Sequence, residues 1–236
     1  MPYHIKANRG DIADTVIGVG DPARAQLYAE EIGAELVNAN RYPVYTGNYR
    51  GMPITIVAHG IGAPSIAIAL EELKMLGMRR FVRIGTAGAL ADLKIGDVVV
   101  ASAAAAAHGG GVLSAYMGGA CPPLAPSPIL TAKLYEGLKG LGAVLGPVVS
   151  SDAFYAEAGA ADLWRSWGAV AVEMECAAAM MLGWLRGFET ACVLVVSNVV
   201  GREETADLRD RFVEVFKRVL EVIWGSYSSS VGSGSP

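Results

Sequence analysis

The earliest glycine-rich segment that could bind a ligand is Gly18-Val19-Gly20-Asp21-Pro22-Ala23-Arg24, which follows an apolar run. It matches the G-x-G-x-x-G/A pattern of dinucleotide sites, but Asp21 as an N-cap and Pro22 at the first helical position explain much of it as the start of a helix. A helix N-terminus binds anions, and Arg24 in the first turn adds a guanidinium. The segment therefore predicts either a phosphate site or a plain strand-turn-helix.

A second segment, Phe81-Val82-Arg83-Ile84-Gly85-Thr86-Ala87-Gly88, places an arginine inside an apolar strand and follows it with small residues. A buried arginine requires an anion, which is either a carboxylate of the protein or a bound phosphate with the Thr86 hydroxyl as a further donor. Neighbouring parallel strands build ligand sites at their carboxyl ends. Together, Arg24 and Arg83 suggest one inorganic phosphate site.

The third segment is Val172-Glu173-Met174-Glu175-Cys176. Glu173 and Glu175 point to the same side while the chain is extended, so both carboxylates could accept hydrogen bonds from vicinal hydroxyls such as those of ribose. Alternatively, Glu175 only stabilises the N-terminus of the helix that follows.

Short apolar runs alternate with helical patterns along the chain, and these elements must position the three segments. Strands are predicted over 16–19, 54–58, 81–84, 97–100, 144–149, 170–172 and 191–196. Helices are predicted over 22–32, 64–77, 128–140, 160–168, 176–187 and 205–226. The alternation indicates a single α/β domain over 1–227, with a sheet buried on both faces, followed by a low-complexity tail over 228–236.

Composition limits the possible partners. The net charge of the 236 residues is -4, so we expect no general binding of nucleic acid. Apolar residues make up 53% of the chain, yet no run of about 20 apolar residues is free of glycine and proline, so we expect no membrane partner. The first residues do not resemble a signal peptide, which favours a cytoplasmic protein. The three cysteines are not clustered, so no metal site is indicated.

Taken together, these motifs resemble the hexameric nucleoside phosphorylases, which comprise purine nucleoside, uridine and 5'-methylthioadenosine phosphorylases. The resemblance extends from His4 to about Val222 and looks strongest to the archaeal purine-type members. Six ordered motifs carry it: Gly20-Asp21-Pro22-Ala23-Arg24, Arg41 with Tyr45-Thr46-Gly47, His59-Gly60-Ile61-Gly62-Ala63-Pro64-Ser65, Arg83-Ile84-Gly85-Thr86-Ala87-Gly88, Ser151-Asp152-Ala153-Phe154-Tyr155 and Val172-Glu173-Met174-Glu175. The family implies a three-layer αβα fold with a central mixed sheet.

The resemblance also implies a role for each matching residue. Phosphate would be bound by Gly20, Arg24, Arg41, Arg83 and Thr86, and ribose by His4, Glu173, Met174 and Glu175. The base would contact Ala87, Gly88, Phe154 and Asn198. His4 and Arg41 would come from a neighbouring subunit, so the family implies a dimer as the smallest working unit and a hexamer as the assembly. Large obligate interfaces are apolar, which would explain the apolar composition.

The implied reaction is phosphorolysis, which needs inorganic phosphate as co-substrate and no cofactor. Phosphate attacks the anomeric carbon, and Arg83 and Glu175 would act with Asn198 on an oxocarbenium-like transition state. Purine enzymes of this type usually carry an aspartic acid where this chain has Asn198. An amide offers a donor and an acceptor but no proton to transfer, so we expect 6-oxopurine nucleosides to be favoured.

Several alternatives remain from the sequence. Asn198 also fits a uridine phosphorylase, although the Gln and Arg with which those enzymes read the pyrimidine are absent after Tyr155. A 5'-methylthioadenosine phosphorylase, a nucleosidase that uses water, and a noncatalytic nucleoside-binding protein are further possibilities. Arg211 has a spacing that would suit an assisting role, but a solvated helix face explains it equally simply.

Overall fold

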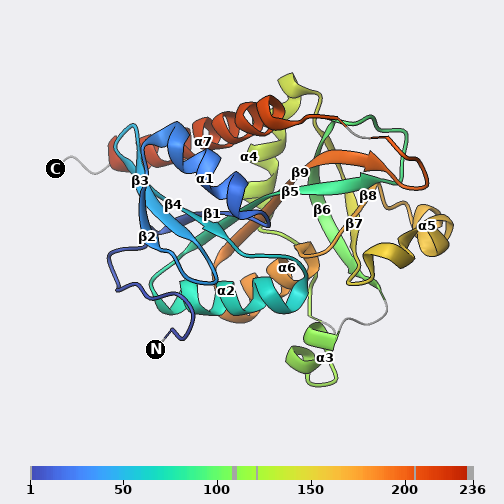
Figure 1. Cartoon of the computed structure of the whole chain (residues 1–236), viewed down its shortest axis with the longest axis horizontal. Helices are drawn as coiled ribbons and strands as arrows, with labels where there is room; N and C mark the ends of the chain where they lie inside the picture. Colours follow the sequence, from blue (N-terminus) through green and yellow to red (C-terminus); the bar gives the residue numbers. More distant parts are fainter. Residues whose placement is uncertain (1, 108–110, 121, 205, 233–236) are drawn as a thin grey trace.

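The centre of the protein is a mixed sheet of nine strands, described here from a computed structural model (Figure 1). The structure describes residues 2–107, 111–120, 122–204 and 206–232, and the strand count refers to these ranges. The strand order is β2-β3-β4-β1-β5-β8-β7-β6-β9. The strands are β1 (Thr15–Val19), β2 (Glu35–Asn38), β3 (Val44–Tyr49), β4 (Met52–Ala58), β5 (Arg80–Ala89), β6 (Val98–Ala106), β7 (Val144–Ser150), β8 (Ala171–Glu173) and β9 (Glu189–Val199).

Strand β5 connects the two halves of this sheet. Its first residues pair in parallel with β1, in the register Gly18 to Arg83, and its end pairs antiparallel with β8, in the register Gly88 to Val172. Along its other edge β5 pairs in parallel with β9. Strands β5, β8, β7, β6 and β9 therefore close into a ring, whereas β2, β3, β4 and β1 form an open extension.

Helices cover both faces of the sheet, which gives three layers (Figure 1). Helices α1 (Pro22–Ile32), α4 (Pro128–Leu138) and α7 (Arg209–Gly232) pack on one face through residues such as Tyr28, Leu134 and Phe216. Helices α2 (Ala63–Met75) and α6 (Cys176–Arg186) pack on the other through residues such as Leu70 and Met181, near the short helix α3 (Gly111–Met117).

Helix α5 (Glu157–Ser166), which follows the 3-10 turn η3 (Phe154–Ala156), lies beyond the β8 and β7 end of the sheet. Its Trp164 and Ala161 pack with Val149 and Val172 in a third, smaller cluster. A second 3-10 turn, η2 (Lys139–Leu141), follows α4. None of the helices in the described ranges has both the length and the apolarity that crossing a bilayer requires.

The predicted fold class is confirmed, since the chain forms one α/β domain with a mixed sheet between two helical layers. All seven predicted strands are present, and α1 has the predicted bounds Pro22–Ile32. Asp21 caps that helix as expected, because its Oδ1 accepts a hydrogen bond from Ala23 N at 2.9 Å.

Other boundaries differ from the prediction. Strands β2 and β3 and helix α3 were not predicted, and β5 continues to Ala89 through the small residues that followed the predicted strand 81–84. Helix α5 begins at Glu157 instead of residue 160 because the turn η3 leads directly into it. Helix α7 begins at Arg209 and continues to Gly232, into the segment that the sequence suggested was a tail.

Candidate active site

Most of the predicted site residues line one cavity of about 620 Å³, where the ends of β1, β5, β8 and β9 meet the start of α5. The predicted residues that line it are Gly20, Arg24, Arg83, Thr86, Ala87, Gly88, Phe154, Glu173, Met174, Glu175 and Asn198. A second cavity of about 730 Å³ on the α7 side shares Asp21, Arg24, Thr86 and Ser197 with it. Of the site residues predicted from the sequence, all except His4 and Arg41 therefore line this cavity.

Arg24 lies between the two cavities in the first turn of α1. Its guanidinium carbon is 3.9 Å from the ring centroid of Phe212, a cation-π contact with the start of α7. Burial lowers the pKa of Arg24 below its ordinary value, and Tyr28 and Asp21 oppose this shift. No hydrogen bond or ion pair holds the Arg24 side chain among the described residues, so its N–H groups are available to an anion.

Arg83 of β5 is the buried cation at the centre of the cavity, with 3% of its surface exposed. A Cβ atom on Gly85 would lie 1.9 Å from Arg83 Nη1, so only glycine leaves room for the guanidinium beside its own strand. Arg83 Nη2 donates to Glu175 Oε2, and Nη1 is 3.6 Å from Glu173 Oε2. Nε and Nη1 have no hydrogen-bond partner among the described residues.

The charge of Arg83 is secured by these two carboxylates. Burial alone would lower the pKa of the guanidinium, but Glu175 and then Glu173 raise the pKa above its ordinary value. Arg83 is therefore a permanent cation, and its Nε and Nη1 have no hydrogen-bond partner among the described residues. Such buried donors are costly unless a ligand uses them.

The sequence offered the alternative that Glu175 only stabilises the N-terminus of the helix that follows it. In the structure, Glu173 has that role and Glu175 does not. Glu175 is the residue that precedes α6, yet its carboxylate does not cap the helix and instead accepts from Gly62 N at 2.6 Å and from Arg83. The carboxylate of Glu173 takes the capping position, accepting from Glu175 N at 2.7 Å, from Cys176 N at 2.9 Å and from Ser150 Oγ. Glu173 thus fixes the start of α6, and Glu175 remains beside the cavity.

The loop between β4 and α2 supplies the partner of Glu175. Gly62 adopts φ +85, and Ala63 N donates to Asp152 Oδ1 at 3.2 Å, which ties the loop to the segment before η3. His59 in this loop is buried, and burial followed by the charge of Arg83 holds its pKa well below the ordinary value. Because His59 Nδ1 is 2.9 Å from Gly60 O, which can only accept, the neutral ring carries its proton on Nδ1.

A β-bulge places two consecutive residues of β9 in the cavity. In a regular strand Ser197 and Asn198 would face opposite sides of the sheet. The pairing of β5 with β9 shifts between Ala87 and Gly88, where Ala87 pairs with Val196 and Gly88 with Asn198. Both Ser197 and Asn198 consequently line the cavity, as bulges beside functional sites commonly arrange. Asn198 Oδ1 lies 3.1 Å from Ser197 Oγ, which donates to it.

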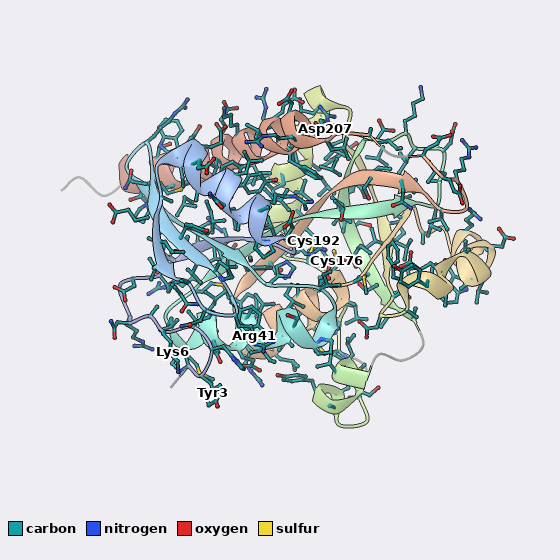
Figure 2. The ribbon with its side chains drawn as sticks, in the orientation of Figure 1. Tyr3, Lys6, Arg41, Cys176, Cys192 and Asp207 are labelled. Atoms are coloured by element: carbon teal, nitrogen blue, oxygen red, sulfur yellow. The ribbon has the colours of Figure 1, made fainter. Side chains whose placement is uncertain are left out.

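His4 and Arg41 do not line this cavity. Figure 2 shows Arg41 on the same side of the molecule as Tyr3 and Lys6, far from Asp207 of the second cavity. The His4 ring contacts the Tyr42 ring, next to Arg41, with centroids 5.8 Å apart. Glu72 of α2 anchors this N-terminal segment by accepting from Tyr3 N at 2.9 Å, from His4 N at 2.9 Å and from Ile5 N at 2.7 Å.

Arg211 has a structural environment that the sequence did not predict. It donates to Gly96 O at 2.8 Å and Leu141 O at 2.7 Å and forms an ion pair with Glu214 at 2.6 Å. It therefore attaches α7 to two loops and lines neither cavity described above. His108 and Cys121 lie outside the described residues.

Sequence reasoning missed three residues that shape the site. Ser150 bonds the Glu173 carboxylate, and Glu72 anchors the segment of His4. Glu157 lines the cavity, although the sequence analysis assigned it no role. Only Glu157 carried a signal, since it lies two residues after Tyr155 in the chain.

Comparison with known proteins agrees with the fold. Residues 14–223 match the family model described as the phosphorylase superfamily. The chain is 33% identical to "Purine nucleoside phosphorylase DeoD-type" of Clostridium novyi, over 94% of this chain and 97% of the relative. It is 35% identical to "Guanosine phosphorylase" of Halorubrum lacusprofundi, over 92% of both chains, and 35% identical to a DeoD-type purine nucleoside phosphorylase of a Geobacillus strain, over 94% and 96%. The chain therefore belongs to the phosphorylase superfamily, as a pentosyltransferase.

Proposed function

We propose that the protein catalyses the phosphorolysis of purine nucleosides, with 6-oxopurines favoured, to free base and ribose 1-phosphate. Inorganic phosphate is the co-substrate, and no cofactor takes part. The names of the relatives, which are purine nucleoside and guanosine phosphorylases, support this proposal.

The observation that carries the proposal is the set of donors around Arg83. Nε and Nη1 of Arg83 are buried without a hydrogen-bond partner among the described residues, and the guanidinium of Arg24, which no hydrogen bond or ion pair holds there, lines the same cavity. Thr86 and Gly20, which lies two residues before the start of α1 at Pro22, line the same cavity. A doubly charged, multidentate anion such as phosphate matches two guanidinium groups and a helix N-terminus better than a neutral ligand does.

The carboxylates that line the cavity can accept hydrogen bonds from the ribose hydroxyls. Glu175 is held by Gly62 N and Arg83, which fixes its carboxylate against rotation, and Met174 lines the cavity beside it. We place the ribose hydroxyls on the carboxylate of Glu175. Glu173 would support this contact indirectly, because it binds the backbone N–H groups of Glu175 and Cys176 and so fixes the position of Glu175. Phosphate on the arginine side would then lie below the anomeric carbon and stabilise the positive charge that develops there.

The base would occupy the remaining end, beside Ala87, Gly88, Asn198 and the Phe154 ring at the mouth. Phe154 is 54% exposed and lines the cavity, so its ring is not part of the core. Asn198 would hydrogen-bond the departing base through its amide, which favours inosine or guanosine. The alternative functions are those of a uridine phosphorylase, which Asn198 would also fit, and of a 5'-methylthioadenosine phosphorylase.

A second subunit would complete the site. His4 and Arg41 lie together on one side of the chain and outside its own cavity, which is what residues donated to a neighbour require. We therefore propose a homo-oligomer with a dimer as the smallest active unit and a hexamer as the assembly.

The function is tested by comparing steady-state kcat/KM for inosine, adenosine, 5'-methylthioadenosine and uridine at saturating phosphate. The proposal predicts efficient cleavage of inosine with formation of ribose 1-phosphate. Efficient cleavage of uridine with little activity on inosine would overturn it.

A further inference from the structure

Glu157 is a buried carboxyl group in the cavity that the phosphate and ribose roles leave unused. It is the first residue of α5, with 7% of its surface exposed, and it lines the cavity together with Val172 and Asn198. No hydrogen bond or ion pair holds its side chain among the described residues. The oxygens of Glu157 are not among the side-chain atoms that are fully buried without a hydrogen-bond partner in the described part of the chain, so they reach the cavity, where a ligand group is the expected partner.

The neighbouring residues place Glu157 at the base end of the cavity. A Cβ atom on Gly88 would lie 3.3 Å from both Asn198 Nδ2 and Val172 Cγ1, so these three residues adjoin one another. Val172 packs in the same small cluster as Ala161 and Trp164 of α5. Arg24 belongs to α1, whereas Figure 1 shows α5 at the opposite end of the sheet from α1, beyond β8.

The charged groups around Glu157 leave it without a cation. Burial and, to a smaller extent, the charge of Glu173 together raise the pKa of Glu157 to about 7. Arg83 is paired with Glu175, and on α5 itself Arg165 donates to Asp162 at 2.7 Å and to Leu90 O at 2.9 Å. Asp21 and Arg24 complete the charged groups that line the cavity.

The direction of its pKa shift argues against a role for Glu157 as a carboxylate that only stabilises the N-terminus of α5. An ionised acid at a helix N-terminus gains from the helix dipole, and that gain lowers a pKa. The pKa of Glu157 is shifted the opposite way, and Ala156 at the N-cap has no side-chain capping bond. Glu157 can therefore change its protonation state at neutral pH inside the cavity.

We propose that Glu157 determines base specificity by contacting N1 of the bound purine: its carboxylate accepts the N1–H of a 6-oxopurine, and its protonated form donates to the bare N1 of a 6-aminopurine. This inference rests on the proposed function, since it assumes a purine in the cavity. N1 of a 6-oxopurine is a hydrogen-bond donor, whereas N1 of a 6-aminopurine is an acceptor. A carboxyl group accepts hydrogen bonds when it is ionised and can donate one when it is protonated. The preference between the two bases then follows the charge on Glu157.

The test measures kcat/KM for inosine and for adenosine from about pH 6 to about pH 8, below the range in which the base of inosine loses its own proton. In the wild type the ratio of inosine to adenosine is expected to rise about tenfold or more across this range. Glu157→Gln keeps the size of the side chain but cannot titrate, so its ratio is expected to be independent of pH.

Asp162→Asn is the matched control, because Asp162 lies on the same helix with a fully exposed side chain. It is expected to keep the pH dependence of the wild type. A ratio that does not change with pH in the wild type, or that changes equally in Glu157→Gln, would overturn the inference while the phosphorolysis itself stands.

A binding experiment separates this inference from the proposed function. Calorimetry of hypoxanthine and adenine at the same pH values measures the preference without turnover. A preference for hypoxanthine that grows with pH in the wild type and is lost in Glu157→Gln supports the inference even if no nucleoside is cleaved, in which case only the proposed function fails. No pH-dependent preference in binding would contradict the inference.

Discussion

Arg83 and Glu175 are 92 residues apart in the chain and form a buried ion pair at the centre of the cavity. The sequence left open whether Arg83 has a carboxylate partner or binds phosphate. The structure provides the carboxylate and still leaves Nε and Nη1 of Arg83 without a hydrogen-bond partner among the described residues, although Nη1 lies 3.6 Å from Glu173 Oε2. The same arginine can therefore stabilise the fold and bind an anion.

Replacing Arg83 should damage both folding and activity. Arg83→Ala would leave Glu175 and Glu173 buried without their cation, which costs about 3–5 kcal/mol when one partner of a buried pair is removed. We expect a lower free energy of unfolding by urea denaturation and no measurable turnover. A variant that retains the stability of the wild type would contradict the role of the ion pair.

Arg24→Ala is the matched comparison, because Arg24 has a cation-π contact but no carboxylate partner among the described residues. We expect stability to fall by no more than about 1 kcal/mol. The KM for phosphate should rise by about tenfold to hundredfold, since a charge-assisted hydrogen bond to phosphate is lost. An unchanged KM for phosphate would remove Arg24 from the proposed anion site.

Gly85→Ala tests whether the space beside Arg83 matters. The added Cβ would collide with the guanidinium at 1.9 Å from Nη1, so Arg83 must move or the strand must shift. We expect a loss of stability of about 1–3 kcal/mol by urea denaturation and a large loss of kcat/KM.

Gly159→Ala is the control for that substitution, since a Cβ there would meet nothing within 4 Å. Gly159 lies in α5, where alanine is favoured over glycine by up to about 1 kcal/mol. This variant should be as stable as the wild type or more so. Equal behaviour of the two alanine variants would show that the close approach at Gly85 has no consequence.

Glu72 should make the attachment of the N-terminal segment dependent on pH. Burial would raise the pKa of Glu72, but hydrogen bonds from Ile5, His4 and Tyr3 lower it below the ordinary value of 4.5. The folded pKa is thus lower than the unfolded one, so the stabilisation is present above about pH 4.5 and is lost as the pH falls through the lower folded value.

We expect Glu72→Gln to reduce the free energy of unfolding by about 1–3 kcal/mol at neutral pH. The difference from the wild type should shrink below the folded pKa, where Glu72 is protonated in both states. Denaturation curves of both proteins across this pH range provide the measurement. A difference that stays constant into acid would refute the role of the ionised carboxylate.

Mixed oligomers would test the shared site. In a mixture of equal amounts of Arg24→Ala and Arg41→Ala subunits that assemble at random, about a quarter of the sites receive both arginines. We expect each variant alone to be impaired and the coexpressed mixture to recover activity toward that fraction. No recovery in a properly assembled mixture would mean that Arg41 serves the cavity of its own subunit or none.

The sequence predicted the buried strands well because continuous apolar runs are typical of strands that are covered on both faces. It missed the edge strand β2 and its neighbour β3, which include exposed residues such as Glu35 and Asn48. It also ended β5 too early, because the glycine-rich segment 85–88 looks like a loop but pairs with β9.

The motifs predicted most residues of the cavity because glycine and charge stand out in an apolar sequence. The sequence could not predict that Glu173 caps α6 while Glu175 stays beside the cavity. These roles depend on hydrogen bonds from Ser150 to Glu173 and from Gly62 to Glu175, and both donors belong to distant parts of the chain. The same holds for the bulge that places both Ser197 and Asn198 in the cavity. Glu157 was assigned no role because its position two residues after Tyr155 is the only signal in the sequence, and its burial is visible only in the fold.

The most direct measurement is the dependence of inosine cleavage on phosphate. With the purified protein in phosphate-free buffer, we predict no release of hypoxanthine. Added phosphate should restore release, with one ribose 1-phosphate formed for each base. Undiminished release of hypoxanthine without phosphate, with free ribose as the other product, would show that water is the nucleophile and would contradict phosphorolysis.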